Sequence, residues 1–369
     1  MQIARVEVTP VELPLGLPYR MLDGRDIRHT AAVIVRIETR QGLVAWGATA
    51  VDPAFTDLPL ADVVRVCRVC ADRARDLNPL NLEYALAELA TVAQDMPSAL
   101  CAFDIAFHDL LGLAAQLPLY RLLGGYRSRI QTSITVPRAS IPETVELARR
   151  YAQQGFRILK IKSSHQALED VRRMRAVHDA LPNLFLRLDA EGGYTVQEAL
   201  DVAAALQTAH SRRVGSQRAP STAPLLEMLE QPTPADDLEA LQQVTARSAV
   251  PILADESVRG PASALELAGR RAAHGLTVKM ATCGGIHCGR QIDAIARAAH
   301  LATMVGCVHE PALLTAAGLG LALSSPNVRY GDLDGYLGLV GDPTVPGFQL
   351  EDGWLIAQDR PGLGCTVDL

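Results

Sequence analysis

The chain has 369 residues, of which 49% are apolar, so it is long enough to build one large domain or two around a sizeable core. Its net charge of −6 at pH 7 argues against the basic surface of a nucleic-acid-binding protein. No run approaches the roughly 18 continuous apolar residues of a membrane span, and residues 1–15 lack the apolar core of a signal peptide. Seven cysteines, an odd number, indicate reduced thiols and a cytoplasmic location.

The first part of the chain predicts an α+β domain. Two segments alternate apolar and polar residues like antiparallel strands, and two longer segments have helical periodicity. In chain order these segments are residues 3–15, 30–49, 59–77 and 82–116. We expect residues 1–125 to form a capping domain, and the C-terminal segment 341–369 to return to it.

From about residue 130, short apolar runs alternate with amphipathic stretches. The runs are residues 131–136, 156–162, 184–190, 225–232, 251–257, 276–280, 302–307 and 327–332. Strands alternating with helices predict βα units around a parallel sheet, and eight strands close a (β/α)8 barrel. We therefore expect an α/β fold in which residues 126–340 form a (β/α)8-type catalytic barrel. The polar segment 209–224 is interpreted as an inserted surface loop.

A polar residue ends each predicted strand. These residues are Thr135, Lys162, Asp189, Glu230, Asp255, Lys279, Cys307 and Asp332. In a parallel barrel the carboxyl ends of the strands converge on one mouth, where active sites lie. The pattern therefore predicts that these side chains meet.

Asp189, Glu230 and Asp255 end three consecutive strands, which predicts a metal site. Three carboxylates raise one another's pKa values and need a cation between them. Oxygen ligands without His or Cys favour Mg²⁺, with Mn²⁺ as a substitute. The alternative is that each acid caps the helix that follows its strand.

Lys162 and Lys279 flank the acidic strands on opposite sides, and Lys160 shares a strand face with Lys162. A lysine acts as a base only when its pKa is lowered, and we expect Lys160 and the metal to lower that of Lys162. A metal with two opposed bases suits removal of a proton next to a carboxylate and its return from the other face, because the metal stabilises the enolate. The alternative is a purely structural set of salt-bridged lysines.

Several motifs resemble the enolase superfamily, in its muconate-lactonizing subgroup, over nearly the whole chain. They are "KIK" (160–162), "DAEGGYT" (189–195), "EQP" (230–232), "DES" (255–257), "VKMATCGGI" (278–286) and residues 104–125. The resemblance implies a capped barrel with a Mg²⁺ held by the three acids and with Lys162 and Lys279 as bases. Two residues depart from the family pattern, since Glu191 stands where Asn is usual and Tyr194 where Trp is common.

"GDLDGY" (331–336) resembles dipeptide epimerases, in which a D-x-D motif at this place holds the α-ammonium of the substrate. Asp332 and Asp334 face the same way, and two carboxylates suit a group with three donors. The alternative is that Asp334 and the glycine after it make a turn. The resemblance also implies substrate contact by Thr135 and a supporting position behind the site for Glu310.

The resemblance implies Mg²⁺-dependent epimerisation of L,L-dipeptides at the α-carbon of the C-terminal residue, in a homo-oligomer. Rival reactions on the same scaffold are those of N-acylamino acid racemase, o-succinylbenzoate synthase and a hydroxyproline-type dehydratase. The D-x-D motif argues against acylated substrates, which carry no ammonium. A barrel that binds a metal or ligand without catalysis is a further alternative, but such a protein has no need for two bases.

The capping domain is expected to close loops 19–29 and 51–58 over the mouth. L-Ala-D/L-Glu epimerases use an arginine in the first loop to hold the glutamate carboxylate, and Arg25 is the nearest candidate. Asp23 and Asp26 lie in the same loop, and pairing with either would remove that cation. We therefore expect dipeptides with uncharged or basic C-terminal side chains. The glycines in "CGGIHC" (283–288) could let the backbone approach a substrate.

Overall fold

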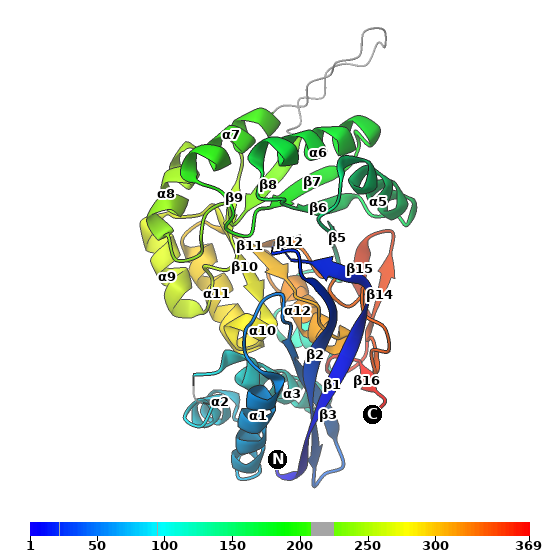
Figure 1. Ribbon diagram of the computed structural model, residues 1–369. Helices are drawn as coiled ribbons and strands as arrows, with labels where there is room; N and C mark the ends of the chain where they lie inside the picture. Colours follow the sequence, from blue (N-terminus) through cyan, green and yellow to red (C-terminus); the bar gives the residue numbers. More distant parts are fainter. Residues whose placement is uncertain (22, 94, 208–224) are drawn as a thin grey trace.

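The computed structural model describes residues 1–21, 23–93, 95–207 and 225–369 (Figure 1). A curled parallel sheet with helices around it packs against a long antiparallel sheet with its own helices, and both chain termini lie on the side of the antiparallel sheet (Figure 1). The segment 209–224, interpreted as an inserted loop, lies outside the described residues.

The antiparallel sheet consists of β1 (Ile3–Arg20), β2 (Asp26–Thr39) and β3 (Val44–Val51) in that order. α1 (Leu60–Ala74), α2 (Leu82–Ala90) and α3 (Pro97–Ala115) follow it. The predicted helical region 82–116 consists of two helices. Pro97 begins the second helix, and a proline lacks the N–H that would continue a helix from the preceding turn.

α3 is the core helix of this part. It lies so close to β3 that a Cβ at Gly47 would stand 1.9 Å from the carbonyl oxygen of Ala102, so only glycine fits there. Within the described residues it is the one helix that is long and apolar enough to cross a membrane, but 67% of its apolar window is buried in this fold. Its hydrophobicity is therefore explained by the core it fills.

The parallel sheet has eight strands in chain order, and each strand is parallel to its neighbour, as predicted. They are β5 (Ile134–Val136), β6 (Ile158–Lys162), β7 (Phe185–Asp189), β8 (Leu226–Glu230), β9 (Ile252–Ala254), β10 (Gly275–Lys279), β11 (Ala302–Gly306) and β12 (Val328–Gly331). Just before β5, Thr132 forms an isolated parallel bridge with Gly331 of β12, and the Ser133 N–H donates to the Gly331 carbonyl, which brings the two edges of the sheet together.

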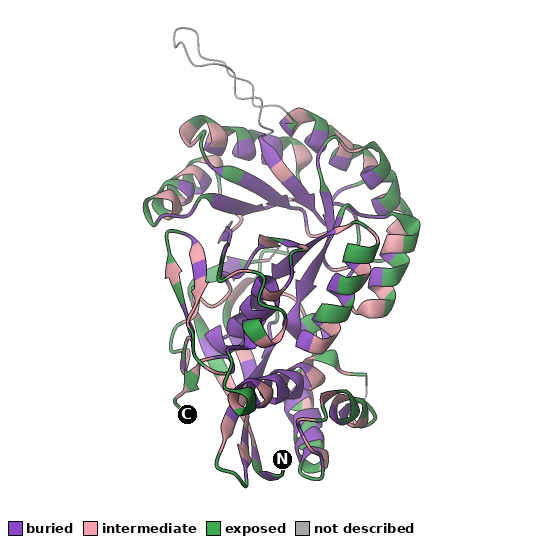
Figure 2. Cartoon of the chain, turned by 180° about the vertical axis from the view of Figure 1, so that it is seen from behind, coloured by how far each residue is buried: buried purple, intermediate pink, exposed green. Residues whose placement is uncertain are grey.

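Helices cover the outside of the barrel (Figure 1). They are α5 (Ile141–Gln153), α6 (Ala167–Ala180), α7 (Val196–Leu206), α8 (Leu238–Arg247), α9 (Pro261–Arg270), α10 (Met280–Cys283), α11 (Ile286–Ala298) and α12 (Ala312–Ser324). The strands are mostly buried, and the helices expose their outer faces except α12, which is buried along nearly its whole length (Figure 2). The core therefore lies between sheet and helices, and the strand ends are left to form the mouth.

The helices after the acidic strands have caps of their own. Thr195 accepts a hydrogen bond from the Glu198 N–H at the start of α7, and Asp237 accepts one from the Ala240 N–H at the start of α8. α9 begins after Gly260 with a proline in its first turn. The strand-end acids are therefore not needed as helix caps, which removes that alternative.

The C-terminal segment contacts both parts of the molecule. Its hairpin of β14 (Phe348–Glu351) and β15 (Trp354–Ala357) pairs with β4 (Arg129–Gln131) at the entry to the barrel, while β13 (Thr344–Val345) pairs with β16 (Thr366–Val367). Farther on, the Leu363 N–H donates to Asp109 in α3, and the Leu119 N–H at the start of α4 (Leu119–Leu122) donates to the Gly362 carbonyl. The proposed domain limits stay predictions.

Hydrogen bonds hold the antiparallel sheet against the barrel mouth. Asp52, just after β3, accepts from both the backbone N–H and Nδ1 of His309, at 2.9 and 2.7 Å. Thr30 in β2 donates to the His309 carbonyl, and the Tyr19 ring packs edge-on against the His309 ring. The end of the capping sheet is thereby fixed over the strand ends of the barrel.

Candidate active site

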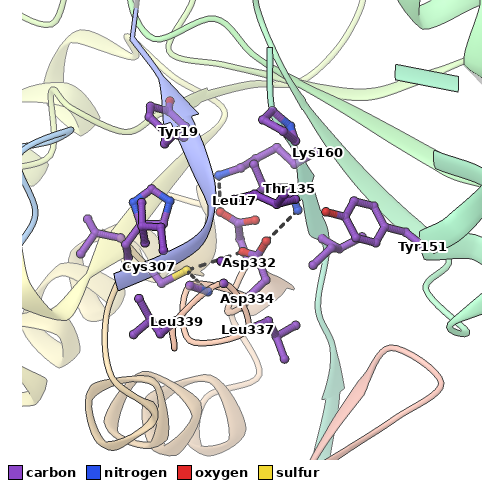
Figure 3. Close-up of a pocket in the computed structure, with 18 of the residues that line it drawn as sticks. Leu17, Tyr19, Thr135, Tyr151, Lys160, Cys307, Asp332, Asp334, Leu337 and Leu339 are labelled. Carbon is purple, nitrogen blue, oxygen red and sulfur yellow. Dashed lines mark hydrogen bonds and ion pairs between the residues drawn. The ribbon is translucent and has the colours of Figure 1, made fainter. Parts of the chain in front are cut away.

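A cavity of about 530 Å³ lies where the capping sheet meets the barrel mouth. Lys160, Lys162, Asp332 and Asp334 line it from the barrel, together with Tyr19 and Phe55 from the capping side. Lys160, Asp332, Asp334 and Tyr19 are labelled in Figure 3. The prediction that Lys160 and Lys162 point to the same face of their strand is confirmed, because both side chains reach this space.

Three carboxylates meet beside the cavity. Asp189, Glu230 and Asp255 each offer an oxygen atom, and these three oxygens lie within 4.8 Å of one another. Asp189 and Glu230 are register partners at the ends of β7 and β8, and Asp255 directly follows β9, so neighbouring parallel strands bring them together. All three side chains are buried.

The donor set fits a hard divalent cation. Glu230 Oε1 accepts from the Thr277 hydroxyl at 2.9 Å, but Glu230 Oε2 is buried and accepts no hydrogen bond from the described residues. Burial, together with the neighbouring Asp189 and Asp255, raises the pKa of Glu230 well above its ordinary value. Oxygen atoms of this kind, crowded and only partly compensated, are the ligands that Mg²⁺ prefers.

Two buried lysines flank the carboxylates. Lys162 Nζ donates to Asp189 Oδ2 at 2.8 Å, and Lys279 Nζ donates to Asp255 Oδ2 at 2.6 Å. The Phe55 ring centre lies 5.3 Å from the first nitrogen and 4.7 Å from the second, so both lysines border the same small space.

The groups around the two lysines shift their pKa values in both directions. Burial lowers the pKa of Lys162 and Lys160 lowers it further, but Asp189 and Tyr19 raise it, and the net effect of all its neighbours is a raised pKa. Burial likewise lowers the pKa of Lys279, and Asp255 and Glu256 raise it above the ordinary value. Lys160 therefore does not by itself turn Lys162 into a base.

The two aspartates of the D-x-D motif have different partners (Figure 3). Asp332 forms an ion pair with Lys160 and accepts from the Ser133 hydroxyl at 2.5 Å. Asp334 Oδ2 accepts from the Thr135 N–H at 2.7 Å, and among the described residues Asp334 forms no ion pair. The Asp334 carbonyl also accepts from the Leu337 N–H, so the backbone makes a turn while the carboxylate lines the cavity.

Within the described residues, neither Arg25 nor Glu310 forms a hydrogen bond or ion pair with the carboxylate triad. Arg25 pairs with Asp23 at 2.5 Å at the surface, and its side chain is 69% exposed. Glu310 is buried and accepts from the Thr315 hydroxyl at 3.2 Å and from the Val308 N–H at 3.4 Å. Burial raises the pKa of Glu310 to about 8. It supports the loop after β11.

The sequence reasoning missed four residues at the site: Tyr19, Phe55, Arg138 and Glu256. Glu256 follows Asp255 directly and is half-buried, and desolvation of its carboxylate together with that neighbour raises its pKa to about 7. Phe55 falls in the loop that we expected to close the mouth. Arg138 comes two residues after β5, a position at which a polar strand-end residue could have been considered.

The glycine at position 285 is required by a contact within the protein and not, as the sequence had suggested, by the approach of a substrate. It lies at φ +104°, and a Cβ there would stand 2.3 Å from Asp104 Oδ2. The Asp104 carboxylate, from α3, accepts the N–H groups of Ile286 and His287 at the start of α11. The glycine therefore admits this capping carboxylate rather than a substrate.

Comparison with known families decides the relationship. The family model for the mandelate racemase / muconate lactonizing enzyme N-terminal domain matches residues 3–124, and that for the enolase C-terminal domain-like fold matches residues 143–369. This chain belongs to the enolase superfamily. The division agrees with the capping sheet and the barrel described above.

Its similar superfamily members include named dipeptide epimerases. The L-Lys-D/L-Arg epimerase of Methylococcus capsulatus is 34% identical, and the match covers 99% of each chain. The hydrophobic dipeptide epimerase of Enterococcus faecalis is 32% identical over 99% of this chain and all of that protein. The crystal structure of the Enterococcus faecalis dipeptide epimerase complexed with Mg and L-Leu-L-Tyr has a TM-score of 0.91 and 31% identity, covering 99% of this chain and 100% of that one.

Proposed function

We propose that the protein is a dipeptide epimerase that inverts the α-carbon of the C-terminal residue. The observation that carries this proposal is the pair of buried lysines, Lys162 and Lys279, on two sides of a carboxylate triad and facing one space. The dipeptide epimerases among its relatives, and their complexes with Mg and dipeptides, support the same reaction.

Asp334 binds the free α-ammonium of the substrate in this account. Its carboxylate lines the cavity and is held by the Thr135 N–H. Asp332 assists as a neighbouring acceptor, but Lys160 already neutralises much of its charge. Lys160 and Lys162, which pair with Asp189 of the triad, line the same cavity as Asp334, so an ammonium at Asp334 leaves the substrate carboxyl end to face the triad.

Asp189, Glu230 and Asp255 would hold Mg²⁺, which would offset their charge and stabilise the negative charge that develops on the substrate carboxylate. One lysine starts as the free amine and removes the α-proton from its face. The other lysine starts as the ammonium and delivers a proton to the opposite face. Turnover exchanges the protonation states of Lys162 and Lys279, so the reverse reaction, or exchange with water, restores them.

The cavity favours substrates without an acidic C-terminal side chain. The cation expected to read an acidic side chain, Arg25, is paired with Asp23 at the surface. Apolar side chains at the capping end and after β12, such as Leu17, Leu337 and Leu339, form much of the cavity wall (Figure 3). The similarity to relatives named for cationic and for hydrophobic dipeptides supports this assignment.

The experiment is to incubate the Mg²⁺-loaded protein with a pool of L,L-dipeptides and to separate the diastereomers by chiral chromatography. We expect L,D-products from dipeptides with uncharged or basic C-terminal residues. N-succinyl and N-acetyl amino acids serve as matched substrates that lack the ammonium, and preferential racemisation of those would favour the N-acylamino acid racemase reaction instead. The cytoplasmic location and the homo-oligomeric state stay predictions.

A further inference from the structure

Glu191 occupies a strained position beside the proposed base Lys162. It lies two residues after Asp189 at φ +46°, in the left-handed region. Asn tolerates this conformation better than Glu, because its short polar side chain can bond to the local backbone. A glutamate here is unfavourable for the backbone, so the contacts of its longer side chain must offset that cost.

The Glu191 carboxylate joins three groups. Its Oε1 accepts from the Tyr19 hydroxyl at 2.8 Å and from Lys162 Nζ at 2.9 Å. The Arg138 guanidinium forms an ion pair with Oε2. The Glu191 and Arg138 side chains are only 15% and 10% exposed, so these charged contacts are shielded from water.

Arg138 extends the contacts to the capping sheet. Its Nε donates to the Ser163 carbonyl at 2.6 Å, which fixes the guanidinium to the loop after β6. Its Nη1 donates to the Tyr19 hydroxyl at 3.2 Å and to the Arg20 carbonyl at 3.1 Å. Tyr19, Arg138, Lys162 and Glu191, which we call the Glu191 cluster, therefore connect the end of β1 to one lysine of the barrel.

The cluster also fixes the direction of the amine. Lys162 donates one N–H to Asp189 and one to Glu191. A neutral amine has two N–H groups and one lone pair, so two fixed acceptors leave the lone pair in a defined direction. Lys279 shares the Phe55 ring with Lys162, but its hydrogen bond goes to Asp255 and not to the Glu191 cluster.

We propose that Glu191 is a positioning residue for Lys162, which couples the placing of this one base to the seating of the β1 end over the mouth. This inference rests on the proposed function, because it concerns one of the two bases. It assigns a role to the glutamate that stands where the family usually has asparagine. The effect is specific to one face of the substrate, since Lys279 has no bond to the cluster among the described residues.

The test isolates each lysine. In Lys279→Ala, any exchange of the substrate α-proton with D₂O must pass through Lys162, and in Lys162→Ala it must pass through Lys279. Glu191→Gln is added to each background, and deuterium uptake from the L,L- and L,D-dipeptides is followed by mass spectrometry. Adding Glu191→Gln should lower uptake by roughly tenfold or more in the Lys279→Ala background, where Lys162 is the remaining base, because Lys162 loses a charged partner. In the Lys162→Ala background, where Lys279 is the remaining base, the same change should lower uptake by less than about twofold.

Three further variants sharpen the result. Glu191→Asn carries the usual family amide, which is too short to make these contacts, and should reproduce the selective loss. Tyr19→Phe removes the hydroxyl but keeps the ion pair between Glu191 and Arg138. We therefore expect a smaller loss of deuterium uptake through Lys162. Glu239→Gln removes an exposed carboxylate on α8 and should change uptake in neither background.

A purely structural role for Glu191 predicts a different pattern, in which uptake falls equally on both faces together with the temperature of unfolding. That pattern, or unchanged uptake in all Glu191 variants, overturns the inference. If the unsubstituted protein epimerises dipeptides but Glu191→Gln shows no face selectivity, only the positioning role fails. If the unsubstituted protein neither epimerises dipeptides nor takes deuterium into them, the proposed function fails as well.

Discussion

Lys160 and Asp332 form an ion pair inside the barrel mouth, between β6 and the residue that follows β12. Because of this pairing, the negative charges of the two aspartates of the D-x-D motif are compensated to different extents. Asp332 is neutralised from within the protein, whereas Asp334 has the Thr135 N–H as a hydrogen-bond donor and no ion pair among the described residues. Asp334 is therefore the stronger site for a substrate ammonium.

Asp334→Asn should raise KM for dipeptides by about 10- to 100-fold, because a charge-assisted hydrogen bond contributes about 1.5–3 kcal/mol. The measurement is steady-state kinetics with a dipeptide and with its N-acetylated analogue. The analogue has no ammonium, so its residual turnover should change little. A larger loss for the analogue than for the dipeptide would contradict the assignment of Asp334.

Asp332→Asn should act mainly on stability. It leaves the buried Lys160 ammonium with Asp189 at 3.3 Å as its nearest remaining carboxylate. We expect the free energy of unfolding to fall by about 1.5–3 kcal/mol, measured by urea denaturation. Asp334→Asn should be less destabilising, since Asn can still accept the Thr135 N–H, and the reverse order would contradict the charge assignment.

Glu230→Gln should separate metal binding from folding. It removes one of three crowded like charges, so the metal-free variant should be at least as stable as the unsubstituted protein. Mg²⁺ at 100 times its dissociation constant should stabilise the unsubstituted protein by about 2.7 kcal/mol and the variant much less. Thermal unfolding with EDTA and with Mg²⁺ measures both. An equal response to Mg²⁺ would place the metal elsewhere.

The barrel and its acids were predictable because their pattern is local and periodic. Each predicted strand carries a polar residue near its carboxyl end, and parallel neighbours such as Asp189 and Glu230 must then converge. Tyr19 and Arg138 were not predictable in the same way. They reach Glu191 from another strand and another loop, 172 residues away for Tyr19, and no periodic signal encodes such a contact.

Arg25→Ala tests the proposed substrate preference. Because Arg25 pairs with Asp23 at the surface, its removal should change kcat/KM by less than about twofold for L-Ala-L-Lys and L-Ala-L-Leu, as for an exposed ion pair. L-Ala-L-Glu is the comparison substrate and should be the poorest of the three. A preference for L-Ala-L-Glu that disappears in Arg25→Ala would make Arg25 the specificity residue.

Gly285→Ala tests the contact that fixes the segment after Lys279. The new Cβ would collide with Asp104 and hold a positive φ, so the free energy of unfolding should fall by more than about 1 kcal/mol. Gly269→Ala is the matched control, since this helical glycine is exposed and has no atom within 4 Å of an added Cβ. It should stabilise the protein by up to about 1 kcal/mol.

The outcome for the glycines shows why their role was not predictable. The sequence marks Gly284 and Gly285 as a place where the backbone could approach a substrate, but at Gly285 the structure brings a protein carboxylate close instead. The approaching group is Asp104, which lies 181 positions earlier in the chain and reaches the start of α11 only through the docking of α3. The pairing of Lys160 with Asp332 was also not predicted from the sequence, because each of these residues had been given another role.

The central claim is that Lys162 and Lys279 serve opposite faces of one α-carbon. Its most direct test is to incubate Lys162→Ala and Lys279→Ala separately with the L,L- and the L,D-dipeptide in D₂O, and to measure both α-deuterium and configuration. Neither variant should interconvert the epimers, and each should exchange deuterium with one epimer only, the two variants with opposite epimers. Interconversion by either variant at the unsubstituted rate, or exchange with the same epimer by both, would contradict the account.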